Sequence, residues 1–448
     1  MKPASLAALA IALSVGTSTL ALAQTTQPGA TTINPTETEN DAGTIEQMTP
    51  GNDPVTGLDA PSRGGAAAST GGGNAGDATR TAAESAAIAA DPMARADADM
   101  KTVLDALAGL NPKPIADLSP GDAREQPTPA AAVKKVLEDR GDSAAPSDAV
   151  TTEDVSFQGA ETEIPARVYK PANAEGQLPV VLYFHGGGWV IADIDTYDAS
   201  ARAIAEKANA IVVSAHYRQA PEHKFPAAHD DAIAAYKWVL ENADDWGGDP
   251  SKVAVMGESA GGNLAINVSI AAREQNLAMP VHQVLIYPVA GTDMETRSYM
   301  ENADAKPLNK AMMGWFVEQT LANDDQMSDP RLDLVDEADV SGLPPTTLIT
   351  AEIDPLQTEG QQLANKLQAA GVPVNGRTYL GVTHEFFGMN AVVEDAETAQ
   401  QLVADDLRSA FDTAPSNAGN AAATGGSDDA ATGAVTPANE PEARPAQQ

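Results

Sequence analysis

The sequence predicts an α/β fold with a mostly parallel central sheet and helices on both faces. Three observations support this prediction. Short apolar runs rich in β-branched residues recur along the chain, which is typical of buried parallel strands. Helical patterns separate most of these runs, so strand and helix alternate. A chain of 448 residues with 43% hydrophobic content also has enough apolar material for a sizeable core.

The predicted strands begin with a pair around Gly159 and end before a final helix. The strand runs are 155–157, 164–169, Pro179–His185, Ala210–Ala215, Lys252–Met256, His282–Tyr287, Thr346–Thr350 and Asn375–Tyr379. The helices are predicted over Thr196–Asn209, Ala227–Asn242, Ala260–Gln275, Gln357–Ala370 and Val393–Ser409. Because helices alternate with most of the strands, one sheet wound on both faces is expected.

Two further segments fall outside this alternation. In the first, 91–150, apolar residues recur at helical spacing within Met100–Leu107, and a short helix is predicted over Ala130–Asp139. In the second, 292–342, no clear strand appears, but Ala311–Leu321 has a helical pattern. We predict that these segments are cap elements that together form a lid over the carboxyl edge of the sheet.

The N-terminus predicts a cleavable signal peptide over residues 1–23. Lys2 supplies the positive start, residues 6–20 are mostly apolar or small, and 21–23 (Ala-Leu-Ala) fit a cleavage site. A membrane anchor is less favoured, because the apolar run is short and is interrupted by Ser, Gly and Thr. We therefore expect export to the periplasm or the extracellular space, with no transmembrane anchor after cleavage.

Low-complexity segments flank the predicted folded domain, 91–411. Residues 24–90 are rich in Thr, Gly, Ala, Asn and Pro, and residues 412–448 look the same, so both are predicted to be a disordered linker or tail. The chain has no cysteine. Its stability must therefore come from packing rather than from disulfides.

The chain is strongly acidic, with a formal net charge of −36. This charge argues against binding nucleic acid or an anionic membrane through a basic patch. Most of the acidic excess lies within the predicted domain rather than in its flanking segments. A well-solvated, aggregation-resistant surface is the favoured interpretation, and adaptation to high salt is the alternative.

Two glycine-rich motifs carry the chemical information. Gly257–Gly261 (Gly-Glu-Ser-Ala-Gly) follows an apolar run and precedes a helix, as a nucleophile elbow does. Upstream, His185–Gly188 (His-Gly-Gly-Gly) suits a backbone loop that aims N–H groups at a developing oxyanion. Alone, the first motif is equally explained by an ordinary serine in a strand–helix turn. The two motifs in this order favour acyl transfer by an activated Ser259.

A nucleophilic serine needs a base. Of the six histidines, His384 lies in a loop after the last predicted strand, from which it can reach the carboxyl edge of the sheet. His185 belongs to the glycine loop and His282 opens a strand. The remaining three are expected to be surface or structural residues, and these are His216, His223 and His229. His384 is thus the predicted base.

The base in turn needs an orienting carboxylate, and Asp354 is the predicted one. It follows a predicted strand and lies between Ser259 and His384, so the chain order is Ser, Asp, His, as in α/β-hydrolases. A helix N-cap role for Asp354 remains an alternative. Glu352 and Glu385 are the nearest rival carboxylates.

These motifs resemble the hormone-sensitive lipase-like esterases, the bacterial family IV group of α/β-hydrolases. The matching segments are His185-Gly186-Gly187-Gly188-Trp189, Tyr217-Arg218-Gln219-Ala220-Pro221-Glu222, Phe225-Pro226-Ala227-Ala228, Gly257-Glu258-Ser259-Ala260-Gly261-Gly262-Asn263-Leu264, Asp354-Pro355-Leu356 and His384-Glu385-Phe386. The resemblance spans about 91–409. It departs from the family pattern at Glu258, His216 and Gln219, and at Gln357 and Thr358, and none of these is a predicted triad or oxyanion residue.

The resemblance implies an α/β-hydrolase fold with a helical cap and a serine carboxylesterase acting on short- to medium-chain acyl esters. It also implies that the backbone N–H groups of Gly187, Gly188 and Ala260 receive the oxyanion, and it raises the possibility of a homodimer. No cofactor or metal is expected. An inactive hydrolase fold that serves as a binding or surface protein is the alternative, as is amidase, lactonase or peptidase activity on the same triad.

Overall fold

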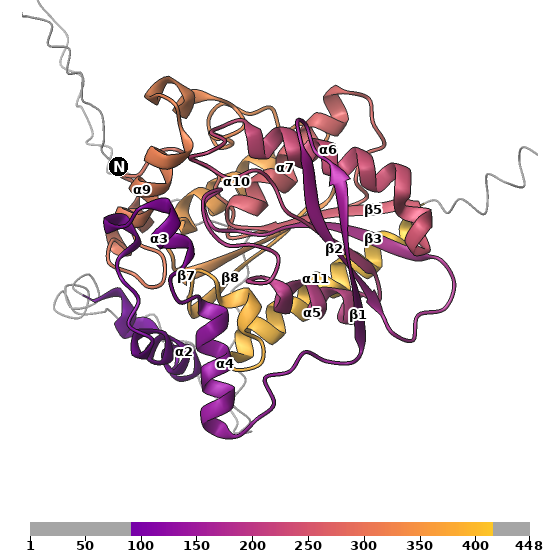
Figure 1. Ribbon diagram of the computed structural model, residues 1–448. Helices are drawn as coiled ribbons and strands as arrows, with labels where there is room; N and C mark the ends of the chain where they lie inside the picture. The colour runs from indigo at the N-terminus through magenta and orange to yellow at the C-terminus, as the bar shows by residue number, and fades with distance from the viewer. Residues whose placement is uncertain (1–90, 415–448) are drawn as a thin grey trace, which may run out of the picture. The chain divides into compact units, whose positions relative to one another are not determined.

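The computed structural model describes residues 91–414, which contain one eight-stranded sheet (Figure 1). The strand order across the sheet is β1-β2-β4-β3-β5-β6-β7-β8. The strands are β1 Val150–Gln158, β2 Glu163–Pro171, β3 Leu178–Phe184, β4 Ile211–Ala215, β5 Gly248–Glu258, β6 Gln283–Ile286, β7 Thr346–Ile353 and β8 Val374–Thr383. Strand β2 runs antiparallel to both of its neighbours, and all other pairings are parallel. The predicted mostly parallel sheet is confirmed.

Helices cover both faces of this sheet. One face carries α6 Ala227–Asn242, α7 Ala260–Glu274 and α10 Gln357–Ala369, and the other carries α5 Asp198–Ala208 and α11 Glu394–Thr413 (Figure 1). Two short 3₁₀ helices, η3 Ala243–Trp246 and η5 Phe386–Met389, complete the elements around the sheet. The fold is therefore the predicted α/β arrangement.

Strand β3 explains why there are two cores. Successive side chains of a strand point to opposite faces of a sheet. Val180, Leu182 and Phe184 pack in the core beneath α6 and α7, whereas Val181 and Tyr183 pack in the core beneath α5 and α11. A strand buried on both faces has no polar face, so its sequence reads as a continuous apolar run.

Strand ends are where the predicted boundaries are wrong. The prediction for β5 was Lys252–Met256, but the strand spans Gly248–Glu258. Strand β8 was predicted over Asn375–Tyr379 and spans Val374–Thr383. The added residues include glycine and polar side chains, which join the sheet through backbone hydrogen bonds that hydropathy does not register.

The two segments outside the alternation form short helices that contact one another. The first contains η1 Pro92–Arg95, α2 Ala98–Gly109, η2 Ile115–Asp117, α3 Pro120–Arg124 and α4 Pro129–Arg140, and the second contains α8 Arg297–Glu301, α9 Lys310–Thr320 and η4 Asp324–Ser328. The Trp315 indole N–H of α9 donates to the Leu118 carbonyl at 3.1 Å. This bond joins two parts of the chain that are far apart in sequence.

Local signals fix the ends of α4. The Thr128 hydroxyl accepts a hydrogen bond from the Ala131 N–H at 3.1 Å, and Pro129 occupies the first turn, where its missing N–H costs nothing. Gly141 ends the helix with φ of 78°, a left-handed conformation that glycine adopts without strain.

The segments 1–23 and 24–90, and nearly all of 412–448, lie outside the described residues, so the predictions for them stay predictions. Within residues 91–414, no helix is both long enough and apolar enough to cross a bilayer.

Candidate active site

Ser259 lies in the sharp turn between β5 and α7. Its φ and ψ are 56° and −119°, a region that residues other than glycine rarely occupy. A Cβ on Gly257 would lie 2.0 Å from the Gly261 carbonyl oxygen, and a Cβ on Gly261 would lie 2.1 Å from that of Phe184. Only glycine fits at these two positions. The strained serine between them has the geometry of a nucleophile elbow rather than that of an ordinary turn.

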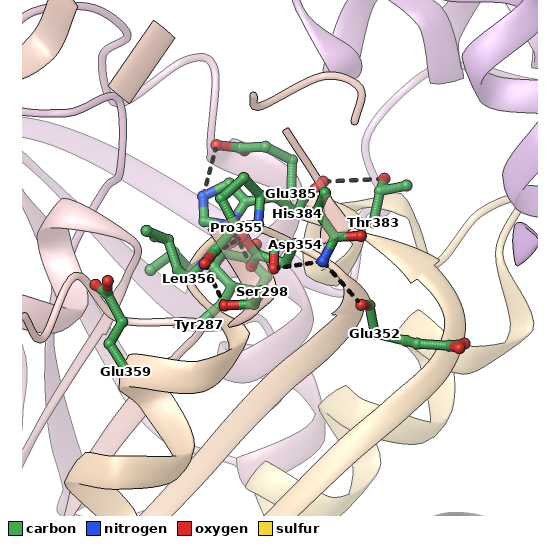
Figure 2. A network of polar contacts seen from close by, with 12 residues as sticks. Tyr287, Ser298, Glu352, Asp354, Pro355, Leu356, Glu359, Thr383, His384 and Glu385 are labelled. Atoms are coloured by element: carbon green, nitrogen blue, oxygen red, sulfur yellow. Dashed lines mark hydrogen bonds and ion pairs between the residues drawn. The ribbon is translucent and has the colours of Figure 1, made fainter. Parts of the chain in front are cut away.

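His384 and Asp354 are buried and hydrogen-bonded to each other. The His384 Nδ1–H donates to Asp354 Oδ2 at 2.7 Å (Figure 2). This bond fixes the tautomer, so in the neutral imidazole Nε2 carries the lone pair. Burial alone would lower the pKa of His384, but the charges of Asp354, Glu385 and Glu258 outweigh it and raise the pKa.

The two rival carboxylates do not occupy the position that Asp354 takes at His384 Nδ1. Glu352 accepts the Gly381 N–H at 2.8 Å and lies 3.7 Å from the Arg95 guanidinium, so it faces away from the histidine. Glu385 Oε1 lies 4.0 Å from His384 Nε2, the nitrogen opposite to the one that Asp354 binds (Figure 2). Asp354 is thus the carboxylate placed to orient the ring.

The turn that carries Asp354 is fastened from the second cap segment. The Ser298 hydroxyl donates to the Pro355 carbonyl at 2.6 Å (Figure 2). The Asn302 side-chain amide donates to the Asp354 carbonyl at 3.0 Å. Asp354 Oδ1 also accepts the Leu356 N–H at 2.9 Å, the local bond expected of a turn-forming aspartate. The predicted alternative of a helix N-cap is wrong, because the N-cap of α10 is Leu356, which has no side-chain cap bond.

Ser259 and His384 line the same cavity, which has a volume of about 970 Å³. Within residues 91–414, no hydrogen bond joins their side chains. Catalytic hydrogen bonds are often long or misaligned without substrate and tighten when it binds. The two residues therefore line one site without a hydrogen bond between their side chains.

The glycine loop after β3 is held by its carbonyl groups. The Gly186 carbonyl accepts from the Tyr217 hydroxyl at 3.0 Å and from His185 Nδ1–H at 2.8 Å. In a planar trans peptide the C=O and N–H groups point in opposite directions. The N–H of Gly187 therefore points away from these buried donors.

The next peptide is held in the same way. The Gly187 carbonyl accepts the N–H groups of Val190 and Ile191 at 3.0 and 2.9 Å. The N–H of Gly188 must then point to the opposite side of the loop. Gly187 and Gly188 have φ of 95° and 59°, which only glycine adopts readily.

The third peptide lies at the start of α7. The Ser259 carbonyl accepts the Val289 N–H at 3.1 Å, so the N–H of Ala260 points away from that bond. As the first residue of α7, Ala260 has no helical partner for its N–H. Gly187, Gly188 and Ser259 all border the cavity. Gly187 and Gly188 therefore border the same cavity as the serine, and Ala260 follows the serine in the chain.

A pair of neutral histidines supports the glycine loop. Because His185 donates through Nδ1 to a carbonyl, its Nε2 accepts from the Nδ1–H of His216, at 2.9 Å. Burial and then the neighbouring His216 lower the pKa of His185 to about 3. His216 also lines the cavity. Sequence patterns placed His216 at the surface or in a structural role and did not reveal this contact with the site.

Glu258, the residue before the serine, is fully buried between two tyrosines. The Tyr183 hydroxyl donates to its Oε1 at 2.7 Å, and the Tyr287 hydroxyl donates to its Oε2. Burial raises the pKa of Glu258 to about 7, against the hydrogen bonds that lower it. The Tyr287 ring in turn packs against His384, with centroids 4.4 Å apart. The residue that departs from the family pattern is thus connected to the histidine.

Comparisons with known proteins identify the family of this chain. A family model described as an alpha/beta hydrolase fold matches residues 181–388. A carboxylesterase of Mycobacterium tuberculosis is 44% identical over 242 residues, which cover 53% of this chain and 76% of the relative. An ethyl acetate hydrolase of Pseudomonas putida is 34% identical over 248 residues, which cover 55% of this chain and 78% of the relative. The chain belongs to the hormone-sensitive lipase-like branch of the α/β-hydrolase family.

Solved structures of esterases match a larger share of this chain. An esterase of Pyrobaculum calidifontis superposes with a TM-score of 0.60 at 37% identity, covering 66% of this chain and 94% of the esterase. An alpha/beta hydrolase from the metagenome of Lake Arreo gives 0.64 at 34% identity, covering 71% of this chain and all of that one. The fold and ester hydrolase activity of this chain follow from these relatives.

The cavity lined by Ser259 and His384 is also bordered by both cap segments. Leu104 and Met93 come from the first segment, and Met312 and Phe316 from the second. Among residues 91–414, no group of three or more His, Cys, Asp or Glu side chains is arranged to hold a metal ion. The absence of a metal or cofactor remains a prediction.

Proposed function

We propose that this protein is a serine carboxylesterase of short- to medium-chain acyl esters, with Ser259, His384 and Asp354 as its triad. His384 Nε2 takes the proton of the Ser259 hydroxyl as that oxygen attacks the ester carbonyl. The alcohol leaves with this proton, and a serine-bound acyl group remains. Water then attacks the acyl group and gives a proton to His384, which passes it to the Ser259 oxygen as the carboxylic acid leaves.

The observation that carries this proposal is the orientation of three peptide groups around a strained serine. The N–H groups of Gly187, Gly188 and Ala260 are fixed before substrate arrives, because carbonyls in the same peptides are tied to buried donors. Preorganised donors of this kind stabilise the oxyanion without reorganisation during the reaction.

The test is the hydrolysis of p-nitrophenyl acetate, butyrate, octanoate and dodecanoate. Ser259→Ala is expected to lower kcat by a factor on the order of 10⁴ or more. Ser143→Ala, at an exposed serine in the first cap segment, is the matched control and should keep wild-type rates. Retention of more than a tenth of the rate in Ser259→Ala would refute the triad. A rate that rises with acyl length to dodecanoate would refute the chain-length preference.

The same experiment separates the alternatives. An inactive hydrolase fold would not react with a fluorophosphonate probe, whereas the proposed enzyme is labelled at Ser259 and the alanine variant is not. Anilide and lactone substrates matched to the best ester test for amidase and lactonase activity. We expect the ester to be hydrolysed faster than either.

Export and pairing are further parts of the proposal. The sequence of residues 1–23 supports cleavage after Ala23, so the mature chain should begin at Gln24 by N-terminal sequencing, and fractionation distinguishes periplasm from medium.

The open edge of strand β8 supports a homodimer. Light scattering of the mature chain that gives a monomer mass at micromolar concentration would contradict the homodimer.

A further inference from the structure

His384 has carboxylates at both ring nitrogens. Asp354 binds Nδ1 at 2.7 Å, and Glu385 Oε1 lies 4.0 Å from Nε2 (Figure 2). In the proposed mechanism, Nε2 is the nitrogen that receives the serine proton. A carboxylate at this position interacts with the proton itself rather than only with the orientation of the ring.

Glu385 is held in this position by two features. The Tyr197 hydroxyl donates to its Oε1 at 2.7 Å. Its backbone φ of 73° is left-handed, a conformation that costs free energy in a residue other than glycine or asparagine and is maintained only where surrounding structure fixes it. Both Glu385 and Tyr197 border the cavity that contains Ser259. The carboxylate is therefore held at the reaction site and does not extend freely into solvent.

We propose that Glu385 is a positioning residue of the catalytic base, whose carboxylate stabilises the protonated His384 from the Nε2 side. The inference rests on the proposed function, since it assumes that His384 is the base. When the histidine takes the serine proton, a positive ring develops between two carboxylates. The same stabilisation applies in the free enzyme at low pH, where a protonated His384 cannot accept the serine proton. Glu385 thus assists the transition state and narrows the active pH range from the acid side.

The groups that face His384 come from several elements. Asp354 follows β7, Glu258 ends β5, and Tyr287 follows β6 and presents its ring. Glu385 is the next residue along the chain. Asp354, Glu385 and Glu258 all raise the pKa of His384. Of the three, only Glu385 is placed at Nε2. Removing its charge therefore changes the stability of the transferred proton but leaves the Asp354 bond that orients the ring.

Glu352 offers a matched control. Its side chain is 20% exposed, as is that of Glu385, and it lies two residues before Asp354. It accepts the Gly381 N–H and faces Arg95 rather than His384. Glu352→Gln and Glu385→Gln therefore remove the same charge at the same exposure, but only the second removes it from Nε2.

The test is the pH dependence of kcat/KM for p-nitrophenyl butyrate in the mature chain. Glu385→Gln is expected to move the acid limb down by roughly one pH unit, with a lower kcat on the plateau and little change in KM. Tyr197→Phe, which frees the carboxylate without removing it, should move the limb in the same direction by a smaller amount. Glu352→Gln should leave the limb in place.

A second measurement does not depend on turnover. In chain labelled with ¹³C-histidine, the His384 signal is assigned by its loss in His384→Gln, and its titration should fall by the same amount in Glu385→Gln. An acid limb and a titration within 0.2 pH unit of wild type would overturn the role of Glu385 while leaving the triad intact. Activity retained in Ser259→Ala would instead refute the triad, and the role of Glu385 with it.

Discussion

Replacing Glu258 with glutamine should change the pH dependence of stability. Glu258 is 1% exposed, and burial raises its pKa from 4.5 to about 7. In the unfolded chain the carboxyl returns to its ordinary value. Because the folded pKa is above the unfolded one, the contribution of this group to stability is complete below pH 4.5 and is lost as pH rises through about 7. Glutamine has nearly the same shape and does not titrate.

The size of the effect follows from the two pKa values. A difference of about 2.5 pH units corresponds to roughly 3.4 kcal/mol between the acidic and alkaline limits. At pH 5 the unfolded carboxyl is already mostly ionised, and roughly 0.8 kcal/mol of that amount has been lost. The free energy of unfolding of Glu258→Gln, relative to wild type, should therefore rise by about 2.5 kcal/mol between pH 5 and pH 8.5.

Urea unfolding followed by tryptophan fluorescence at these two pH values measures the difference. The exposed Glu153→Gln on β1 controls for the loss of one negative charge from an acidic chain. A gap between Glu258→Gln and wild type that changes by less than about 0.5 kcal/mol across the range would refute the raised pKa. Replacing the protonated carboxyl with an amide between the two tyrosine hydroxyls can also cost stability, but this cost does not depend on pH, because both groups are uncharged.

Three further predictions concern the glycine loop and the contacts that hold it. Gly188→Ala should lower kcat by roughly tenfold or more, because its Cβ would lie 2.3 Å from the Phe316 ring, and Phe316→Ala should restore part of the loss in steady-state assays. Arg124→Ala should lower the urea-unfolding free energy by about 1–3 kcal/mol, because the guanidinium holds the Val190 carbonyl at 2.9 Å and two other acceptors. Tyr217→Phe removes a donor to the carbonyl of the peptide that carries the Gly187 N–H, and should lower kcat several-fold with KM unchanged.

The sequence was sufficient to predict the sheet and the serine turn, because both depend on local patterns. Ser259 is identified by glycines within two residues on each side, and their close contacts with backbone oxygens explain why no other residue fits there. The partners of Glu258 could not be predicted in this way. Tyr183 is 75 residues away and Tyr287 is 29 residues away.

Strand register brings these partners together. Tyr183 pairs with Met256 across β3 and β5, and Glu258 pairs with Ile286 across β5 and β6. Met256, the partner of Tyr183, lies two residues before Glu258, and Tyr287 directly follows Ile286, the partner of Glu258. Both tyrosines therefore lie beside Glu258 at the carboxyl end of the sheet. Hydropathy identifies the strands but does not specify this register, since a shift along a uniformly apolar strand leaves the pattern unchanged. The environment of the acid before the serine becomes visible only once the strands are paired.

Three carboxyl groups surround one imidazole in this site, and their different donors give them different roles. Asp354 accepts the histidine Nδ1–H and a backbone N–H. Glu385 accepts one tyrosine hydroxyl and remains partly exposed at Nε2. Glu258 accepts two tyrosine hydroxyls, and burial raises its pKa to about 7. Above about pH 7 Glu258 is therefore mostly ionised and adds its charge to those that raise the pKa of His384, whereas below pH 7 it is mostly protonated and adds little.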